Sequence, residues 1–204
     1  MNACCSSDTG HIAAVVLAAG LSRRMGKPKM LLPWGTTTVI GRVVEVLQQS
    51  GLVEILVVTG GARLEVEKTL AGSRTRTVFN PRFAEGEMIE SLQVGLAAIS
   101  DTASAALVVL GDQPQIETCV VEAVLKAFEQ KRWELVIPSY AMRRGHPWLV
   151  GRSLWPDLIG MQPNQTMRDF MKAHEAVITY LEVDRPSVLK DLDTPQDWER
   201  EHPL

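Results

Sequence analysis

The 204-residue sequence predicts a single-domain α/β protein with a Rossmann-like, mostly parallel sheet that is flanked by helices. Two observations predict this class. Short apolar segments such as Ile12–Leu17 and Ala105–Leu110 are typical of strands that are buried on both faces. Segments with apolar residues at helical spacing, such as Val39–Leu47, separate these strands. Strands that alternate with helices form parallel sheets, because each helix returns the chain to the starting edge of the sheet.

The predicted elements follow one another regularly as far as Pro138. Residues 1–10 show no apolar periodicity, so we expect a disordered tail there and a folded domain over 11–204. Glycines such as Gly51 and Gly60 end the early elements. The predicted strands are 12–17, 55–59, 75–79, 105–110 and 135–138, and the predicted helices are 39–50, 63–71, 89–99 and 121–128.

The rhythm changes after Pro138. Arg143-Arg144-Gly145 predicts a turn, and His146–Val150 predicts a strand that returns from it. Helices are expected near 152–159 and 165–173, and a strand over 178–183. The segment Thr194-Pro195-Gln196-Asp197 predicts a helix start, with a capping threonine, proline at the first position and an acid three residues after the cap.

Composition excludes several classes of protein. Apolar residues make up 46% and charged residues 22% of the chain, which excludes a disordered chain, a collagen or a coiled coil. A net charge of −3 gives no bulk attraction for nucleic acid or anionic membranes, so we expect neither as a partner. The three cysteines do not form a disulfide framework, and the longest apolar run is too short to cross a membrane. The first residues lack a basic start, so a cytoplasmic location is the expectation.

A cationic, glycine-containing loop follows the first predicted strand. Between Leu17 and Lys29, two glycines, Gly20 and Gly26, stand among four cations. Glycine lets the backbone approach a ligand closely, and loop amides, arginine and lysine can all bind phosphate. A Walker loop does not fit, because five residues separate the glycines and Pro28 follows Lys27. The dinucleotide pattern Gly-x-Gly-x-x-Gly is also absent. The loop therefore predicts a phosphate site; a solvated basic loop is the alternative.

Two acidic residues are candidate ligands for a divalent cation. Asp112 follows the apolar strand 105–110, at the edge of a parallel sheet where ligands usually bind. Magnesium usually takes one or two carboxylates and substrate phosphates, so a phosphate-binding loop nearby supports this role. Asp193 is the second candidate, although it could serve only the helix entry at Thr194, and Asp191 could replace it.

The segment Leu17–Lys29 resembles the signature of nucleotidyltransferases with a GT-A-like fold, Leu-Ala-Ala-Gly-x-Ser-x-Arg-Met-Gly-x-x-Lys. The closest resemblance is to molybdenum cofactor cytidylyltransferases, and it extends from residue 12 to about 200. The resemblance implies that Lys29 and Arg24 are catalytic phosphate contacts and that Gly111-Asp112-Gln113-Pro114 and Asp191–Pro195 supply metal ligands, Asp112 and Asp193. It implies nucleotide binding by a set of loop residues and one helix residue: Leu17, Ala18, Ala19, Gly20, Ser22, Arg24, Gly26, Lys29 and Ser91.

Several other residues are candidates for selecting the nucleobase and the acceptor, but their pattern is less specific than that of the cationic loop. Ala19 stands where guanylyltransferases of this group carry glycine, which favours CTP. Met88, Ile89 and Glu90 depart from the small residues that often precede the serine corresponding to Ser91. Arg144-Gly145-His146-Pro147 resembles an acceptor-side element, so His146 is a candidate acceptor contact or a turn residue. Trp148 and Trp155 could stack on a pterin, or pack in the core or at a dimer contact.

Together these observations predict a magnesium-dependent nucleotidyltransferase. The resemblance implies transfer of CMP from CTP to a molybdenum-bearing pterin with release of pyrophosphate, and a molybdoenzyme is a candidate partner. One alternative is a transferase that acts on a sugar or alcohol phosphate. Another, from a different class, is a non-catalytic nucleotide-binding protein that assists the maturation of a molybdoenzyme.

Overall fold

The computed structural model describes residues 10–84, 88–131 and 134–203. The predicted tail at 1–10 lies almost wholly outside these residues, so that prediction and the domain boundary are not tested. Gly10 is the first described residue, and its carbonyl accepts a hydrogen bond from Ser104 Oγ at 2.6 Å. Within the described ranges, none of the helices has both the length and the apolar character that crossing a membrane would require.

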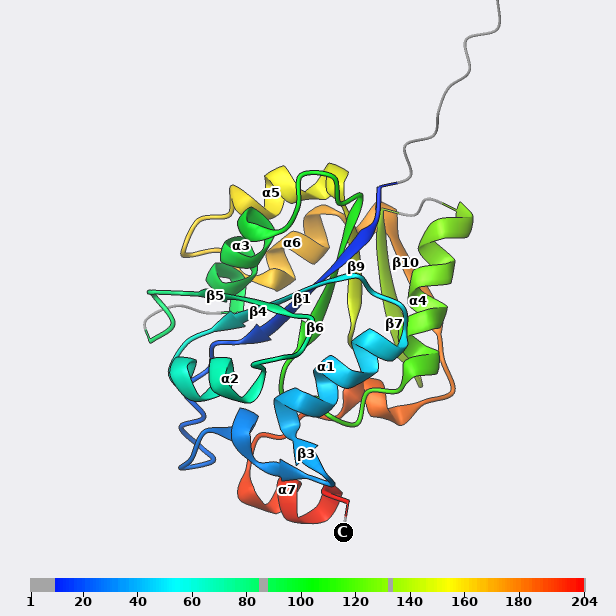
Figure 1. The fold of residues 1–204 in the computed structure, drawn as a ribbon. Coiled ribbons are helices and arrows are strands. Elements are labelled where there is room, and N and C mark those ends of the chain that lie inside the picture. Colours follow the sequence, from blue (N-terminus) through cyan, green and yellow to red (C-terminus); the bar gives the residue numbers. More distant parts are fainter. Residues whose placement is uncertain (1–9, 85–87, 132–133, 204) are drawn as a thin grey trace, which may run out of the picture.

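One sheet of eight strands runs through the centre of the molecule (Figure 1). Its order is β10-β7-β9-β6-β1-β4-β5, with β8 paired to β7. All neighbours are parallel except β9, which is antiparallel to β6 and β7, and β8. The strands are β1 (Ile12–Ala18), β4 (Glu54–Thr59), β5 (Arg76–Phe79), β6 (Ala105–Leu110), β7 (Leu135–Tyr140), β8 (Arg143–Arg144), β9 (Trp148–Gly151) and β10 (Ile178–Glu182).

Helices cover both faces of the sheet, which confirms the predicted fold class (Figure 1). Alternate residues of β1 point to opposite faces. Val16 faces the cluster that contains α1, α2 and α4, whereas Val15 faces the cluster that contains α3, α5 and α6. The helices are α1 (Val39–Gln49), α2 (Arg63–Thr69), α3 (Met88–Ala98), α4 (Thr118–Lys131), α5 (Trp155–Ile159), α6 (Met167–Ala173) and α7 (Pro195–Glu201).

The helix α3 approaches the sheet closely at Gly95. A Cβ atom there would lie 2.3 Å from Val15 Cγ1 and 3.1 Å from Val58 Cγ2. Glycine is therefore required at this position by packing, because the helix could not lie at this distance with any side chain.

The turn predicted at 143–145 lies elsewhere, and this prediction is wrong. Ala141 and Met142 form the turn, with left-handed φ angles of 48° and 61°. Arg143 and Arg144 instead form β8, because they pair with Tyr140 and Ser139 of β7. The strand predicted to return over 146–150 is confirmed as β9, although it begins at Trp148.

Short elements absent from the sequence prediction build a small annex near the carboxyl ends of the strands. A 3₁₀ turn (Lys29–Leu31) precedes a two-stranded hairpin, β2 (Pro33–Trp34) and β3 (Thr37–Thr38), and α7 packs beside it (Figure 1). Trp198 Nε1 donates to Pro33 O at 3.1 Å. A separate apolar cluster holds the annex together: Met25, Leu32, Trp34, Val39 and Leu192, with Trp198 packed against it.

Candidate active site

Two neighbouring strands deliver the candidate residues to the same edge of the sheet. The strands β1 and β6 pair in parallel, with Leu17 opposite Leu110, so the loops that follow them start side by side. Gly111 N donates to Leu17 O at 3.0 Å, which ties the two loops together. The phosphate-loop candidate and Asp112 therefore emerge at one place, the carboxyl edge where α/β sheets bind ligands.

Ser22 organises the loop that follows β1. Its carbonyl accepts from the amides of Met25 and Gly26 at 3.0 and 3.1 Å, and its Oγ accepts from Lys29 N at 3.1 Å. Ser22 and Gly26 both adopt left-handed φ angles, of 52° and 71°. A Cβ atom at Gly20 would contact nothing within 4 Å. Packing therefore does not require glycine at 20, and a ligand could approach the backbone closely at this open position.

The four charged residues that the sequence singled out form one cluster. Lys29 Nζ contacts Asp112 Oδ2 and lies 3.5 Å from Asp193 Oδ1. Arg24 Nη2 lies 2.9 Å from Asp193 Oδ2. The side chains of Lys29 and Asp112 are 13% and 16% exposed, whereas that of Arg24 is 71% exposed. The cluster is thus a pair of half-buried acids neutralised by two cations, one shielded and one on the surface.

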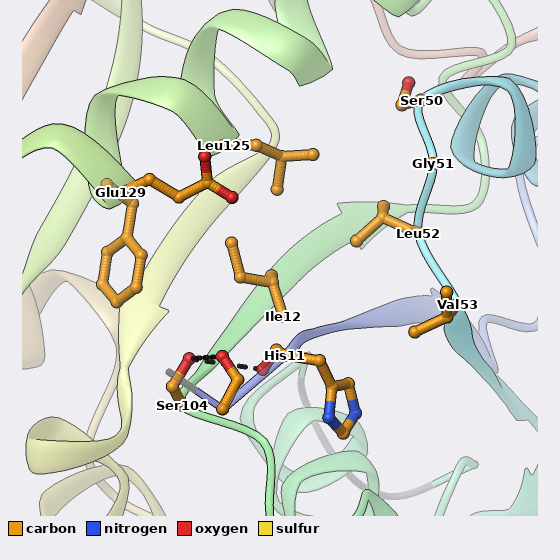
Figure 2. Close-up of a pocket in the computed structure, with 11 residues that line it drawn as sticks. His11, Ile12, Ser50, Gly51, Leu52, Val53, Ser104, Leu125 and Glu129 are labelled. Carbon is orange, nitrogen blue, oxygen red and sulfur yellow. Dashed lines mark hydrogen bonds between the residues drawn. The ribbon is translucent and has the colours of Figure 1, made fainter. Parts of the chain in front are cut away.

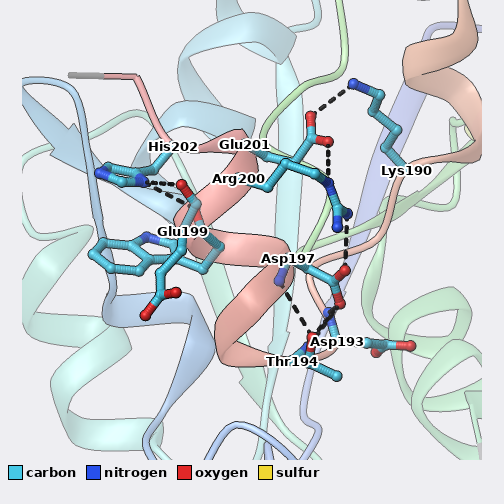
Figure 3. A network of polar contacts seen from close by, with 9 residues as sticks. Lys190, Asp193, Thr194, Asp197, Glu199, Arg200, Glu201 and His202 are labelled. Atoms are coloured by element: carbon cyan, nitrogen blue, oxygen red, sulfur yellow. Dashed lines mark hydrogen bonds and ion pairs between the residues drawn. The ribbon is translucent and has the colours of Figure 1, made fainter.

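The start of α7 delivers Asp193 to the cluster. The predicted capping box is confirmed: Asp197 Oδ2 accepts from Thr194 N at 2.9 Å and from Asp193 N at 3.3 Å (Figure 3). Hydrogen bonds from Thr194, followed by that from Arg200, lower the pKa of Asp197 to about 2. Because Thr194 and Asp197 complete the capping box, the side chain of Asp193 is not used for capping and contacts Arg24 and Lys29. Leu192 N also donates to Asp112 O at 3.1 Å, so the backbones of the two acidic segments are joined.

Asp191, the alternative to Asp193, has a different partner. Its Oδ1 accepts from Gln113 Nε2 at 2.5 Å. Burial raises the pKa of Asp191. The hydrogen bond from Gln113 lowers this pKa, and the negative charges of Asp112 and Asp193 raise it further. Asp193 rather than Asp191 therefore shares the lysine with Asp112.

The donor set suits a divalent cation whose remaining ligands come from a substrate. Among residues 10–84, 88–131 and 134–203, no three His, Cys, Asp or Glu side chains converge as a protein-only metal site would require. Asp112 and Asp193 nevertheless converge on one ammonium group, so their oxygens can reach one cation. Magnesium commonly takes one or two carboxylates and completes its shell with phosphates and water.

Two cavities flank the cluster. One, of about 240 Å³, is bounded by the cationic loop from Gly20 to Pro28 and by Gly61 and Ala62. The other, of about 280 Å³, has Phe83 and Met88 among its walls; Phe83 belongs to a segment, Asn80-Pro81-x-Phe83-x-x-Gly86, whose sequence resembles a base-contacting segment of the family. Ser91 Oγ lies there and accepts from Asn80 Nδ2 at 3.0 Å. The complete lining of the second cavity is Leu17, Ala19, Gly20, Lys29, Met30, Phe83, Met88, Ser91, Leu110 and Asp112.

Ala18 does not lie with the other loop residues. It is 4% exposed and packs in the cluster that contains α1, α2 and α4. The alternation of side chains along β1 explains this, because Leu17 and Ala19 pack in the cluster on the opposite face.

His146 and the two tryptophans lie apart from the charged cluster. The ring of His146 stacks on Trp148 at 4.4 Å, and its Nε2 is buried with no hydrogen-bond partner among the described residues. Burial lowers the pKa of His146 to about 4. Trp148 and Trp155 belong to the apolar core, and their indole N–H groups donate to Gly145 O and Val150 O. Core packing, one of the three roles considered for these tryptophans, is therefore the one observed.

A larger cavity, of about 770 Å³, lies away from this chemistry (Figure 2). It opens at the amino end of β1, beside Ile12, and α4 contributes Leu125 and Phe128. His11 there is already paired with Glu54, at 2.6 Å. None of the residues that the sequence assigned to the site lines this cavity.

Two curated proteins match almost the whole chain. The chain is 29% identical over 191 residues to "Molybdenum cofactor cytidylyltransferase" of Escherichia coli (strain K12), covering 92% of this chain and 93% of that one. It is 26% identical over 201 residues to "Nicotine blue oxidoreductase" of Paenarthrobacter nicotinovorans, covering 95% and 98%.

Solved structures with a similar fold also match almost the whole chain. The crystal structure of Rv0371c from Mycobacterium tuberculosis H37Rv superposes with a TM-score of 0.82 at 30% identity, covering 94% of this chain and 97% of that one. A complex of that protein with manganese gives 0.78 at 29% identity, covering 93% and 97%. The profile of the MobA-like NTP transferase domain matches residues 14–177. The chain is thus a nucleotidyltransferase that belongs to the MobA-like NTP transferase domain family.

Proposed function

We propose that the protein transfers CMP from CTP to the terminal phosphate of a molybdenum-bearing pterin and releases pyrophosphate. The observation that carries the proposal is the convergence of Lys29, Arg24, Asp112 and Asp193 between a cationic loop and a cavity that contains Ala19 and Ser91. An oxygen of the acceptor phosphate would form a bond to the α-phosphorus of CTP. The bond from that phosphorus to the bridging oxygen would break, and pyrophosphate would leave with the electron pair.

In this proposal the chain contributes positioning and charge. The loop amides and Arg24 would bind the triphosphate, and Lys29 would neutralise the region of the α-phosphate. Asp112 and Asp193 would hold Mg²⁺, which when bound supplies further neutralisation of the phosphates. No strong general base is needed, because the acceptor phosphate is already an anion. Manganese bound to the Mycobacterium tuberculosis relative supports a divalent cation in this fold.

The base would occupy the cavity of about 280 Å³. Ala19 is one of the residues that line it, and an alanine here would leave less space than a glycine, which would favour cytosine over a purine. Phe83 and Met88 offer apolar surfaces for the base, and Ser91 offers a polar group.

The acceptor would lie beside the base. A neighbouring cavity of about 390 Å³ shares Met88 with the base cavity and adds Met167 and Arg168. These side chains suit a flat ring that carries an anionic group. His146 stays a candidate acceptor contact, with a role in the turn as the alternative. The relative from Escherichia coli supports the pterin by its name, and a cytoplasmic location and a molybdoenzyme recipient are parts of the same proposal.

The first test is thermal stabilisation by CTP, GTP, UTP or ATP with Mg²⁺, compared with Mg²⁺ alone. A ligand that binds only the folded protein raises the melting temperature. A shift selective for CTP, followed by release of pyrophosphate when the pterin is added, supports the proposal. A shift selective for UTP or ATP would instead favour a sugar or alcohol phosphate acceptor, and no shift would favour the non-catalytic partner.

A further inference from the structure

We propose that Lys29 is a built-in counter-cation that keeps the carboxylates of Asp112 and Asp193 occupied until a nucleoside triphosphate takes its ammonium group. Binding of nucleotide and of divalent cation would then be coupled through an exchange of partners. This inference rests on the proposed function, since it places the nucleotide and the cation at the site described above.

The contacts of Lys29 carry the inference. Its Nζ contacts Asp112 Oδ2 and lies 3.5 Å from Asp193 Oδ1, so one ammonium group bridges both candidate metal ligands. Arg24 pairs with the other oxygen of Asp193 at 2.9 Å. Two carboxylates thus face two cations, and the cluster is neutral in itself. The side chains of Lys29 and Asp112 are largely shielded from water, where an ion pair is screened less than on the surface.

The ammonium group and a divalent cation compete for the same oxygens. Magnesium binds carboxylate oxygen at about 2.0–2.1 Å, which is closer than any ammonium contact allows. A cation held by both acids would also repel the ammonium group strongly at such short range. Lys29 must therefore leave this position for both carboxylates to bind a metal.

The lysine can leave without movement of the backbone. Lys29 N is held by Ser22 Oγ at 3.1 Å, so the main chain is anchored while the four-carbon side chain stays flexible. Lys29 and Asp112 line the same cavity of about 280 Å³. A phosphate that enters beside this wall offers the ammonium group an anionic partner within reach of the same anchored residue.

This exchange of ion-pair partners makes the binding of nucleotide and of divalent cation cooperative. Either ligand alone must break an ion pair and leave one partner unpaired. Both together convert lysine–carboxylate contacts into lysine–phosphate and carboxylate–metal contacts. Coupling of this kind is reciprocal, so nucleotide strengthens metal binding by the same factor as metal strengthens nucleotide binding.

The first experiment measures Mn²⁺ binding to the nucleotide-free protein by the loss of the electron paramagnetic resonance signal of free Mn²⁺. Lys29→Gln should bind Mn²⁺ roughly three- to tenfold more tightly than wild type, because Asp112 is released and Asp193 keeps only its surface pair with Arg24. Lys27→Gln is the matched control: it removes the same charge from the same loop, but Lys27 lies over the ring of Trp198. Equal Mn²⁺ affinities for the two variants would overturn the proposal.

The second experiment tests the reciprocal effect and does not depend on the stability of Lys29→Gln. Asp112→Asn should bind CTP in EDTA roughly three- to tenfold more tightly than wild type, because Lys29 loses its nearer carboxylate and keeps only the contact of 3.5 Å with Asp193. Asp191→Asn is the control. It removes the charge of a nearby acid that pairs with Gln113, and the asparagine still has an Oδ1 that can accept the hydrogen bond from Gln113. Calorimetry that shows equal gains for both variants would also overturn the proposal.

The same measurements distinguish failure of the proposed function from failure of the counter-cation proposal. If Lys29→Gln tightens Mn²⁺ binding but CTP gives no more stabilisation than other nucleotides, the counter-cation stands and the choice of CTP fails. If CTP is selected and Lys29→Gln resembles Lys27→Gln, the nucleotide proposal stands and the counter-cation fails.

Discussion

Ala19 and Ala18 are adjacent and identical, yet they have opposite surroundings. Ala19 lines the cavity proposed for the base, whereas Ala18 is packed on the other face of the sheet. A difference of one methyl group in a binding pocket is worth about a tenfold change or more in discrimination. The pair therefore offers a test in which the same atoms are removed at neighbouring positions.

Ala19→Gly should improve binding of GTP relative to CTP by on the order of tenfold, because the wider cavity admits a purine. Thermal shifts against nucleotide concentration, with Mg²⁺, give the two apparent affinities. Ala18→Gly serves as the control and should keep the wild-type ratio. If both variants change the ratio equally, the assignment of Ala19 to the base cavity is wrong.

His146 should make the protein less stable in mild acid. Burial lowers its pKa in the folded state to about 4, against 6.5 for the unperturbed group. The unfolded chain therefore binds the proton more readily, and the stability present above pH 6.5 is lost as the pH falls towards 4. The shift corresponds to about 3 kcal/mol at most. Urea denaturation of His146→Gln at pH 7.5 and 5 should show a smaller loss than wild type, whereas His202→Gln should keep the wild-type loss.

The same capping box begins two helices of equal length, but only one of them presents a site residue. Thr194 caps α7, next to Asp193, and Thr166 caps α6, with Asp169 as the partner acid. Loss of a capping threonine costs about 1 kcal/mol of stability. Comparing the two caps separates a general loss of stability from a loss of position at Asp193.

Thr194→Ala should weaken Mn²⁺ binding in the presence of CTP severalfold, because the backbone that carries Asp193 is no longer fixed. Thr166→Ala should lower the free energy of unfolding by a similar amount, about 1 kcal/mol, without this effect. The measurements are Mn²⁺ titration and urea denaturation of both variants. Equal Mn²⁺ affinities would show that α7 does not position the acid.

Packing and helix propensity make opposite predictions at Gly95. In a helix interior, alanine is favoured over glycine by roughly 1 kcal/mol. Here a Cβ atom would lie 2.3 Å from Val15 Cγ1, and overpacking of this kind costs roughly 1–3 kcal/mol. Gly95→Ala should therefore destabilise the protein in urea denaturation. An increase in stability would show that α3 can move away from the sheet at little cost.

At the scale of the whole molecule, the sequence predicted the order of the main elements and the class of the fold. Buried parallel strands are apolar throughout, so Ile12–Leu17 and Ala105–Leu110 were recognisable without context. The hairpin of the annex was missed because β2 and β3 have two residues each, too few for any periodicity to appear, whereas the start of α7 was predicted from its capping residues. The turn at Ala141–Met142 was missed because neither residue is typical of a left-handed turn.

The charged cluster was also predictable, although its internal pairing was not. Lys29, Arg24, Asp112 and Asp193 were chosen from the signature and from the acidic segments, and they lie together. Sequence reasoning treated the cations as ligands for phosphate and the acids as ligands for metal. It could not reveal that the two groups bind each other, because Lys29 and Asp112 meet only in the fold. The site roles themselves stay predictions until the variants are measured.

In the annex, the residues from Leu192 to α7 pack against segments from the first half of the chain and complete the charged cluster. Trp198 holds α7 on Pro33, and Leu192 joins Asp193 to the segment of Asp112. A ribosome would complete every strand of the central sheet before it synthesised Asp193. A truncated product that ended after β10 would therefore contain the whole sheet and the cationic loop and would lack one of the two acids. Translation must pass Asp193 before the product can assemble the charged cluster, so under the proposed mechanism a product that ends before α7 would be inactive.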